Sequence, residues 1–439
     1  MLRFRWETEF KETEIGEIPR DWEVYPLGEV VEDAIVGSTP LKKISKYWTN
    51  GTIPWLTNKE VEYGKINYIE DTEEKVNVIA LEETNLKLVP PNSLIISFTA
   101  SVGKVVINKV PITTNQQFIS FVLKSIPDTV KYLGYFFLLN RELIESFSGA
   151  TPFNFITKEK ALQIPIIFPP LSEQSRIATV LSWFDDLIEV KKRQNEILEK
   201  TAMAIFKSWF IDFEPFRDGK FVYIEELGKE IPKGWEVKRL YELCKILRGL
   251  NFKSNEVIFE YAKGYIPVLR TNNIKGGFEI DFSDLMFVKE DKINPEKLLK
   301  ENDILLSASN GNPELVGNFA VFLNTFTDLT FSFGAFIYLI RVNNHEMFPY
   351  VYLSLSDNSF REYVASAISG TNINNLNLSD LKNFPVLIPP SHILQSFHSL
   401  VEPLFQKIIL NQKQIMTLRK IRDTLLPLLV FGKLRVEEV

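Results

Sequence analysis

Cysteine and histidine are scarce in this sequence. The 439 residues include one cysteine, Cys244, and three histidines, at positions 345, 392 and 398. One thiol cannot build a disulfide framework within the chain or a cysteine-based zinc site. Three histidines crowded into the last quarter leave little for histidine metal chemistry. We therefore expect no metal site and no cofactor.

Basic charge is also limited. Aspartate and glutamate outnumber lysine and arginine by 56 to 50, which gives a formal net charge of -6. Proteins that coat nucleic acid through bulk charge are usually basic, so this total argues against that mode of binding. Local patches differ from the total, because residues 238–277 carry eight basic and three acidic side chains. Any contact with nucleic acid is therefore expected to be local.

Long apolar runs are absent as well. No uncharged apolar stretch approaches the roughly 18 residues that a membrane-spanning helix needs. Residues 1–17 are charged throughout and lack the apolar segment of a signal peptide. We expect a cytoplasmic protein that does not enter a membrane.

What the sequence does contain is an internal repeat. Short motifs of the first half recur about 210 to 220 residues later, and the offset drifts because insertions are tolerated in loops. The recurring pairs are Ile18-Pro19 with Ile231-Pro232, Trp22 with Trp235, Ile53-Pro54 with Ile266-Pro267, Asn92 with Asn302, Val102-Gly103 with Val316-Gly317, and Pro169-Pro170 with Pro389-Pro390. The chain therefore consists of two copies of one unit, each long enough to hold its own core.

Each copy has two parts. Residues 1–170 and 212–390 are rich in short apolar runs separated by glycine, proline and asparagine, a pattern typical of strands, with a few helices such as one over residues 130–147. Residues 171–211 and 391–430 have the pattern of one long helix each, and Ser172 can cap the first. The sequence predicts an α+β fold of two tandem α/β domains and two long helices, the second followed by a tail to residue 439.

The two long helices carry a heptad pattern. Their seam residues alternate at spacings of four and three. They are Ile177, Leu181, Phe184, Ile188, Lys191, Asn195, Leu198, Ala202, Ile205 and Trp209 in the first helix, and Phe397, Val401, Leu404, Ile408, Asn411, Ile415, Leu418, Arg422, Leu425 and Leu429 in the second. Polar seam residues (Lys191, Asn195, Asn411) are typical of a coiled coil that trades stability for register.

We expect the two helices to pair as an antiparallel coiled coil with an internal pseudo-two-fold, although Pro403 and Pro427 should kink or frame the second helix. The alternative is two amphipathic helices, each packed on its own domain. About 38 helical residues span roughly 55 Å. Heads held at opposite ends of such a pair could address duplex half-sites a turn or somewhat more apart, at about 34–36 Å per turn.

The ordered set of motifs resembles the specificity (S) subunit of type I restriction-modification systems over nearly the whole chain. The motifs that carry the resemblance are Gly16-Glu17-Ile18-Pro19 with Trp22 and Leu27, its second copy Gly228 to Pro232 with Gly234-Trp235, Pro169-Pro170-Leu171 with Glu173-Gln174 and Ile177, the central Lys207 to Pro215, and Leu418-Arg419-Lys420 with Arg422-Asp423, Leu425-Leu426-Pro427, Gly432 and Leu434-Arg435-Val436. After Pro390 the second copy departs from the pattern, since Ser391-His392 replaces the usual leucine and glutamate-glutamine pair.

The resemblance implies a division of labour. The two globular parts would be target-recognition domains, each reading one half of a bipartite site in double-stranded DNA. The helices would set the spacer between the half-sites and dock two methyltransferase (M) subunits. Restriction (R) subunits would complete the nuclease. The S subunit itself would have no catalytic residue.

The residues themselves agree with a lack of catalysis. No G-x-x-x-x-G-K-[ST] phosphate loop is present. The double prolines follow Val89, Phe168 and Ile388, so none belongs to the Asn/Asp-Pro-Pro-aromatic motif of amino-methylating enzymes. Glu73-Glu74-Lys75 has nuclease-like spacing but lacks a preceding Pro-Asp pair, and we interpret it as a charged turn. Cys244 lies among apolar neighbours and is expected in the core.

Candidate DNA contacts lie on loops that follow apolar runs, often at matched positions of the two copies. Base edges in the major groove are read by Arg, Lys, Asn, Gln, Ser and Thr. Asn and Thr after a strand also form turns, so each single residue has a structural alternative. The candidates are Thr57, Asn58, Lys59, Ser97, Thr99, Ser101, Lys104, Asn115, Gln116 and Gln117 in the first copy, and Arg270, Thr271, Asn272, Asn273, Ser309 and Asn310 in the second.

Arg270 is the strongest single candidate, because arginine with guanine is the commonest specific pair. Trp209 and Phe210, at the end of the first helix, are candidates for M-subunit contact. Two other functions stay open on the sequence: a single-chain restriction or modification enzyme, and a coiled-coil scaffold that does not bind DNA.

Overall fold

The computed structural model describes residues 2–99, 101–124, 127–147, 156–324, 329–368 and 375–438. Contacts divide the chain into two compact units. The first unit comprises Met1–Leu187 and Leu418–Val439, and the second comprises Ile188–Thr417. This division passes through both long helices. The domain limits expected from the sequence treat each helix as a separate part and stay a prediction.

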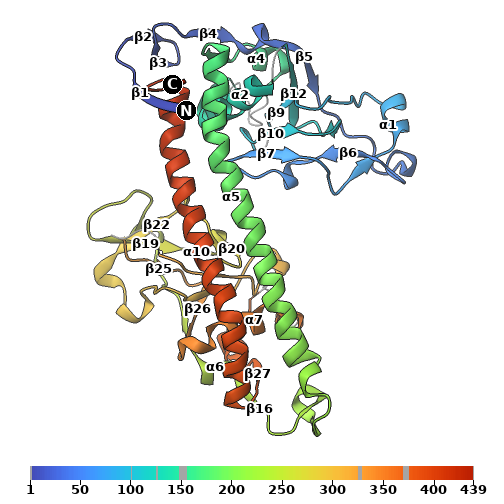
Figure 1. Cartoon of the computed structure of the whole chain (residues 1–439), viewed down its shortest axis with the longest axis vertical. Helices are drawn as coiled ribbons and strands as arrows, with labels where there is room; N and C mark the ends of the chain where they lie inside the picture. The colour runs from blue at the N-terminus through green and yellow to red at the C-terminus, as the bar shows by residue number, and fades with distance from the viewer. Residues whose placement is uncertain are drawn as a thin grey trace. The chain divides into compact units, whose positions relative to one another are not determined.

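A five-stranded sheet forms the centre of the first unit (Figure 1). Its order is β5-β12-β9-β10-β7, and only β10 and β7 are parallel. The central strand β9 is fully buried. The strands are β5 (Val31–Val36), β7 (Ile66–Ile69), β9 (Leu94–Ser97), β10 (Val105–Asn108) and β12 (Phe118–Leu123). Helix α2 (Pro127–Leu139) packs on β10, and α3 (Arg141–Ser146) follows it, so the helix expected over 130–147 is two helices that break at Asn140.

Smaller sheets surround this centre. The three-stranded sheet β11-β6-β8 contains a parallel pair, β11 with β6. Its elements are β6 (Ile53–Leu56), β8 (Lys75–Val76), α1 (Val78–Glu83) and β11 (Thr113–Thr114). Two-stranded pairs join β2 (Phe10–Thr13) with β3 (Gly16–Pro19), and β4 (Glu23–Pro26) with β13 (Pro165–Phe168). Helix α4 (Lys158–Leu162) precedes β13.

The second unit repeats this topology, which confirms the duplication. Its sheet β17-β26-β23-β24 corresponds to β5-β12-β9-β10, and its parallel pair β19 with β25 corresponds to β6 with β11. The strands are β14 (Phe221–Ile224), β15 (Lys229–Pro232), β16 (Glu236–Arg239), β17 (Cys244–Arg248), β18 (Val257–Ile258), β19 (Tyr265–Leu269), β20 (Ile274–Gly276), β21 (Glu279–Ile280), β22 (Met286–Lys289), β23 (Ile304–Ser307), β24 (Phe319–Val321), β25 (Ser332–Phe333), β26 (Ile337–Val342) and β27 (Pro385–Ile388). The short helices are α6 (Leu240–Leu243), α7 (Phe348–Ser356), α8 (Asn358–Ile368) and α9 (Leu378–Lys382).

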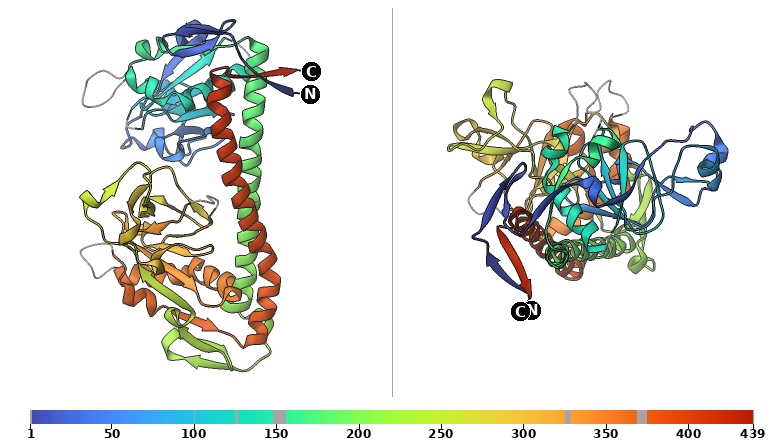
Figure 2. Two further views of the ribbon diagram at one scale, coloured as in Figure 1. Left: turned by 90° about the vertical axis from the view of Figure 1, so that its left-hand side faces the viewer. Right: turned by 90° about the horizontal axis from the view of Figure 1, so that it is seen from above.

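The two long helices are α5 (Leu171–Phe206) and α10 (Ser391–Val430). A π-helical turn, Lys207–Ile211, extends α5 to the end expected from the sequence. The assigned helix α10 continues through Pro403 and Pro427. Within each unit the helices run side by side in opposite directions (Figures 1 and 2). Their antiparallel pairing is therefore confirmed, and the alternative of helices packed on separate domains is not observed.

Polar residues fix the register of this pair. In the second unit the Asn411 side chain is fully buried and donates a hydrogen bond to Asn195 Oδ1 at 2.9 Å. One turn away, Lys191 Nζ donates to Gln414 Oε1 at 2.6 Å. In the first unit, Arg422 Nη1 pairs with Asp185 at 2.6 Å. The bond between these two buried amides forms in only one register, so the polar seam residues specify the alignment that the heptads alone leave open.

The two ends of the chain close the first unit. Strand β1 (Leu2–Trp6) pairs antiparallel with β28 (Leu434–Glu438). The Arg435 guanidinium lies over the ring of Trp22 and pairs with Glu173 and Glu7 at 2.6 Å and with Asp21 at 2.9 Å. Burial would raise the pKa of Glu7, but N–H groups of Thr8 and Glu9 and the arginines lower that pKa to about 2.

Replacement of Arg435 by methionine should destabilise the first unit by about 3–5 kcal/mol, because Glu173 would keep a buried charge without a counter-ion and Glu7 would keep only its contact with Arg5 at 3.4 Å. Thermal unfolding at pH 7 measures the loss. Arg5→Met is the comparison: exposed Arg5 pairs with Glu437 at 2.6 Å and with Glu7 at 3.4 Å, and because Glu7 keeps Arg435 its loss should cost at most about 1 kcal/mol. The Glu7 contribution is present above pH 4.5 and should fade as pH falls toward 2, because its pKa is lower in the folded state. Equal effects of the two variants would contradict this account.

In the helix pair, Asn411→Leu should destabilise the second unit by about 1–3 kcal/mol, because the buried Asn195 Oδ1 loses its hydrogen-bond donor. The double variant Asn195→Leu/Asn411→Leu should recover this loss, since an apolar pair fits a heptad seam. Chemical unfolding of the wild type, both single variants and the double variant gives the coupling energy. Additive effects of the two substitutions would show that the amides do not act as a pair.

Candidate nucleic-acid interface

Three candidate loops of the first unit meet at one edge of its sheets. The Asn115 N–H donates to the Leu56 carbonyl at 3.1 Å, and the Phe98 N–H donates to the Gln117 carbonyl at 2.9 Å. Lys104 Nζ donates to the Asn58 carbonyl at 2.8 Å. The loops after β6, β9 and β11 are therefore joined by direct hydrogen bonds. Polar side chains that lie up to sixty positions apart in the sequence share one surface.

The candidate side chains of this surface differ in exposure. Lys59 and Gln116 are exposed, whereas Thr57, Asn58, Thr99, Ser101, Lys104 and Gln117 are half-buried. Ser97 and Asn115 are buried, and their hydrogen bonds hold the loops in shape. Ser97 Oγ accepts the Lys104 N–H at 2.9 Å, and Asn115 Oδ1 accepts the Gln117 N–H at 3.0 Å. These two side chains stabilise the loops and are not accessible to a ligand. Ala100, in the same segment, lies outside the described residues.

Asn58 has a buried amide group without an internal partner. Neither its Oδ1 nor its Nδ2 makes a hydrogen bond within the described part of the chain, although both atoms are shielded from solvent. Thr57 next to it caps the short helix η3 (Asn58–Glu60) together with Glu60. An unsatisfied buried amide costs about 1–3 kcal/mol, so the folded chain retains a polar group here at the expense of stability.

A fourth segment belongs to this surface and was not among the candidates. The N–H groups of Gly37 and Ser38 donate to the carbonyls of Phe118 and Thr114, at 3.0 and 2.9 Å. The Thr39 hydroxyl donates to Gln116 Oε1. A Cβ atom on Gly37 would lie 2.0 Å from the Asn115 carbonyl oxygen, so this close approach requires glycine. The sequence feature that could have identified this segment is Gly37-Ser38-Thr39, a small polar stretch directly after an apolar run.

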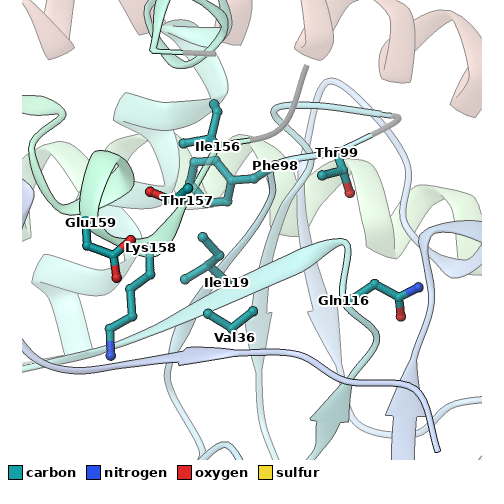
Figure 3. Close-up of a pocket in the computed structure, with 9 residues that line it drawn as sticks. All are labelled: Val36, Phe98, Thr99, Gln116, Ile119, Ile156, Thr157, Lys158 and Glu159. Atoms are coloured by element: carbon teal, nitrogen blue, oxygen red, sulfur yellow. The ribbon is translucent and has the colours of Figure 1, made fainter. Parts of the chain in front are cut away.

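A pocket of about 220 Å³ borders the same surface (Figure 3). Its middle is apolar, with Val36, Phe98 and Ile119. Thr99 and Gln116 lie at one end and Lys158 and Glu159 at the other. Ile156 and Thr157 complete the lining. Apolar surface beside an amide can contact a thymine methyl group and an adjacent base edge.

The second unit repeats the loop arrangement. The Gly334 N–H donates to the Leu269 carbonyl at 2.9 Å, and the Ala308 N–H donates to the Phe336 carbonyl at 2.8 Å. These bonds match those of Asn115 and Phe98 in the first unit. The turn at 334–336 is therefore the counterpart of 115–117, and it presents Phe336 with 61% of its surface exposed. The sequence analysis missed Phe336 because the second copy has no residues similar to the amide cluster Asn115-Gln116-Gln117 of the first.

Arg270 and its neighbours form a compact turn at the end of β19. Asn273 is buried, and its side chain accepts the Arg270 N–H at 2.7 Å and donates to the Asp281 and Asp284 carbonyls. It therefore stabilises the turn. Arg270 pairs with Asp284 at 2.6 Å, and exposed Asn272 donates to the same carboxylate at 2.9 Å. Thr271 is half-buried in the same turn.

Ser309 and Asn310 occupy the loop after β23 and are half-buried. Ser309 forms a β-bridge with Asn375, and Asn310 Oδ1 accepts the Asn312 N–H at 3.0 Å. The backbone bond of Ala308 joins this loop to the 334–336 turn, as noted above.

Phe210 corrects one expectation for partner contact. Its ring is 2% exposed and packs against Phe206, Trp235, Tyr350 and Phe397 in the core of the second unit. Trp209 is half-buried against Phe216 and Phe397. Phe210 is therefore unavailable to a partner. Helix α5 instead exposes a second apolar series at heptad spacing: Trp183, Leu187, Val190 and Ile197.

The described residues contain no group of histidine, cysteine and carboxylate side chains that could hold a metal ion. Cys244 is buried as expected, and burial raises the pKa of its thiol to about 12. Within the same described ranges, none of the helices is long and apolar enough to cross a membrane.

The fold and the matched loops place this chain in a class of proteins that are built from an internal repeat and have one loop surface in each copy. Comparison with known proteins is consistent with this class. The family model for the type I restriction modification DNA specificity domain matches twice, over residues 19–200 and 232–420. The type I restriction enzyme MjaIX specificity subunit of Methanocaldococcus jannaschii is 44% identical over 100% of this chain and 99% of its own.

Two further relatives extend the comparison. The MjaVIII specificity subunit of the same organism is 24% identical over 100% of this chain and 99% of its own. The solved S subunit of a type I restriction-modification system from M. genitalium has the same fold, with a TM-score of 0.51, 19% identity, and coverage of 93% of this chain and 96% of that one. The chain belongs to the family of type I restriction-modification specificity subunits.

Asn58→Leu should raise the free energy of unfolding by about 1 kcal/mol, because it removes two buried polar atoms that lack partners. Asn115→Leu is the matched control and should destabilise the protein, since its amide is hydrogen-bonded at both atoms. Thermal unfolding of both variants measures the difference. A loss of stability in Asn58→Leu as large as in Asn115→Leu would mean that the Asn58 amide is satisfied in solution.

Proposed function

We propose that this chain is the DNA sequence-specificity subunit of a type I restriction-modification complex, and that each unit reads one half of a bipartite target in double-stranded DNA. The duplication of one loop surface is the observation that carries this proposal. Two copies of a surface with matched backbone bonds suit two recognition events on one duplex. The family of the chain supports the same function.

The side chains that we assign to base reading belong to candidates that are exposed or half-buried. In the first unit they are Thr57, Asn58, Lys59, Thr99, Ser101, Gln116 and Gln117, and in the second Arg270, Thr271, Asn272, Ser309 and Asn310. Asn and Gln pair with adenine edges through two hydrogen bonds, and Arg pairs with guanine in the same way. The Asn58 amide would gain on DNA the partners that it lacks in the free chain.

Arg270 illustrates how specificity would arise. In the free chain its guanidinium pairs with Asp284, which also accepts a hydrogen bond from Asn272. A guanine edge offers two acceptors, so Arg270 would exchange the carboxylate for O6 and N7. A base without these acceptors would leave the Asp284 pair intact. Discrimination then comes from the difference between the two partners.

The chain would act with other subunits and without chemistry of its own. We propose that two methyltransferase (M) subunits dock on the long helices, whose exposed apolar side chains include Trp183 and Leu187 in the first unit and Val190 and Ile197 in the second. Such subunits would supply adenine methylation, and restriction (R) subunits would supply DNA cleavage. The helices would set the spacer between half-sites. The cytoplasm, which holds the DNA and these partners, would be the compartment.

Single substitutions should alter one half-site at a time. With M subunits present, Gln116→Ala should relax the base preference at a position of one half-site, and Asn272→Ala should relax a position of the other, each by about 1–3 kcal/mol. Selection from a random duplex library, followed by sequencing, measures the preference. Glu236→Ala, an exposed change on β16 and outside the candidate loops, is the control. Selection of no motif by the wild-type complex would overturn the proposed function.

A further inference from the structure

Tyr63 is an exposed aromatic ring with two cations beside it. Its surface is 46% exposed, although large aromatic rings are usually buried. Lys104 Nζ lies 5.1 Å from the ring centroid, and the Arg141 guanidinium carbon lies 4.9 Å from it. Both distances fall within the range of cation–π attraction. We call these three residues the Tyr63 cluster.

The Lys104 ammonium is held in place by neutral groups and not by a carboxylate. Its ammonium donates to the Asn58 carbonyl at 2.8 Å, and no ion pair joins it to a carboxylate within the residues that the structure describes. Burial lowers the pKa of Lys104, as expected for an ammonium held partly out of water. A neutral carbonyl and an aromatic ring fix its position and leave donors for an anion.

Arg141 is brought to the same ring by a glycine. A Cβ atom on Gly103 would lie 2.9 Å from Arg141 Cγ, and Gly103 has a φ of +88° that side chains disfavour. Arg141 Nε pairs with Glu145 at 2.8 Å. This bond uses one edge of the guanidinium, whose planar fork carries five N–H donors in all. The short loop between β9 and β10 therefore positions a second cation next to the first.

Hydrogen bonds from the helix pair hold the loop that contains Tyr63. Buried Arg422 of α10 donates to the Gly64 carbonyl at 2.9 Å and pairs with Asp185 of α5 at 2.6 Å. Tyr135 donates to the same Asp185 carboxylate at 2.6 Å. All four residues belong to the first unit. Tyr63 therefore stands on a turn that is held by a buried network, so its ring and the two cations are preorganised.

We propose that the Tyr63 cluster binds a phosphodiester of the DNA backbone beside the first half-site. This inference rests on the proposed function and assigns Lys104 to backbone contact in place of base reading. Lysine and arginine are the usual partners of backbone phosphates, which fix orientation and carry no sequence information directly. The cluster adjoins Asn58, so the phosphate contact would set the register in which the recognition loops meet the bases.

The second unit has no lysine at the equivalent position. The Ser97 N–H donates to the Lys104 carbonyl, and the Ser307 N–H donates to the Asn318 carbonyl in the same way. Asn318 therefore occupies the place of Lys104, and an amide replaces the cation. The two units would share the mode of base reading but differ in backbone attraction. Binding of the first half-site should accordingly depend more strongly on salt.

The test uses the full chain with its M subunits and the duplex that the wild-type complex selects from a random library. Affinity is measured from about 50 to 200 mM salt. Lys104→Gln and Arg141→Gln should each make the slope of log K against log salt shallower by about 0.9, and the double variant by about 1.8. Both variants should weaken binding to all selected sequences by the same factor, because a phosphate contact is independent of sequence.

Lys109→Gln is the matched control. Lys109 lies at the other end of β10, is exposed, and packs over Tyr68 at 4.5 Å, so it loses the same charge in a similar setting. It should leave the slope unchanged. A methylphosphonate placed at each phosphate in turn offers a second measurement that needs no variant: one neutralised phosphate should weaken the wild type and leave the Lys104→Gln/Arg141→Gln complex unaffected.

Two results would overturn the proposal. One is an unchanged salt slope in Lys104→Gln and Arg141→Gln. The other is a changed base preference in Lys104→Gln, which would make Lys104 a base reader. Both outcomes assume that the wild-type complex selects a motif. Failure of that selection would instead refute the proposed function, so the two failures are distinguishable.

Discussion

The structure depends on the antiparallel pairing of α5 with α10. Each copy of the repeat ends in a helix whose apolar seam is too long for its own globular part to cover. The other copy supplies the cover: Leu426, Leu429 and Val430 from the end of the chain enter the core of the first unit, together with Ile177 and Leu181 from α5. In the second unit, Ala202 and Phe206 from α5 do the same, together with Phe397, Val401 and Ile408 from α10. The first unit therefore comprises two separate stretches of sequence, Met1–Leu187 and Leu418–Val439, and each unit contains parts of both long helices.

This pairing also explains where polar groups are buried. Asn195, Asn411 and Arg422 lie in the seam because register must be specified between two helices of the same chain. Arg422 adds a connection from the seam to the Gly64 turn. In the second unit, Glu199 of α5 accepts a hydrogen bond from Tyr352, and burial raises the pKa of this carboxyl. The helices thus position the loop surfaces through hydrogen bonds as well as through packing.

Much of this was available from the sequence. The repeat, the seam and its polar residues, and the loops after β6, β9 and β19 follow from periodicity and spacing. The errors of the sequence analysis at the candidate site have physical causes. Ser97 and Asn273 are residue types suited to base contact, but both side chains are buried and stabilise the loops that contain them. Phe210, at the end of the first long helix, was expected at a partner surface but fills a core. Lys104 and Arg141 lie 41 and 78 positions after Tyr63, and only the fold brings them to its ring.

The central claim is that two loop surfaces on one chain read two separate half-sites. The most direct measurement is to map the positions that the chain and its methyltransferase subunits modify on genomic DNA. The account predicts one motif made of two fixed half-sites, separated by a constant number of base pairs at which any base is accepted. A single continuous motif, or modification without sequence preference, would contradict it.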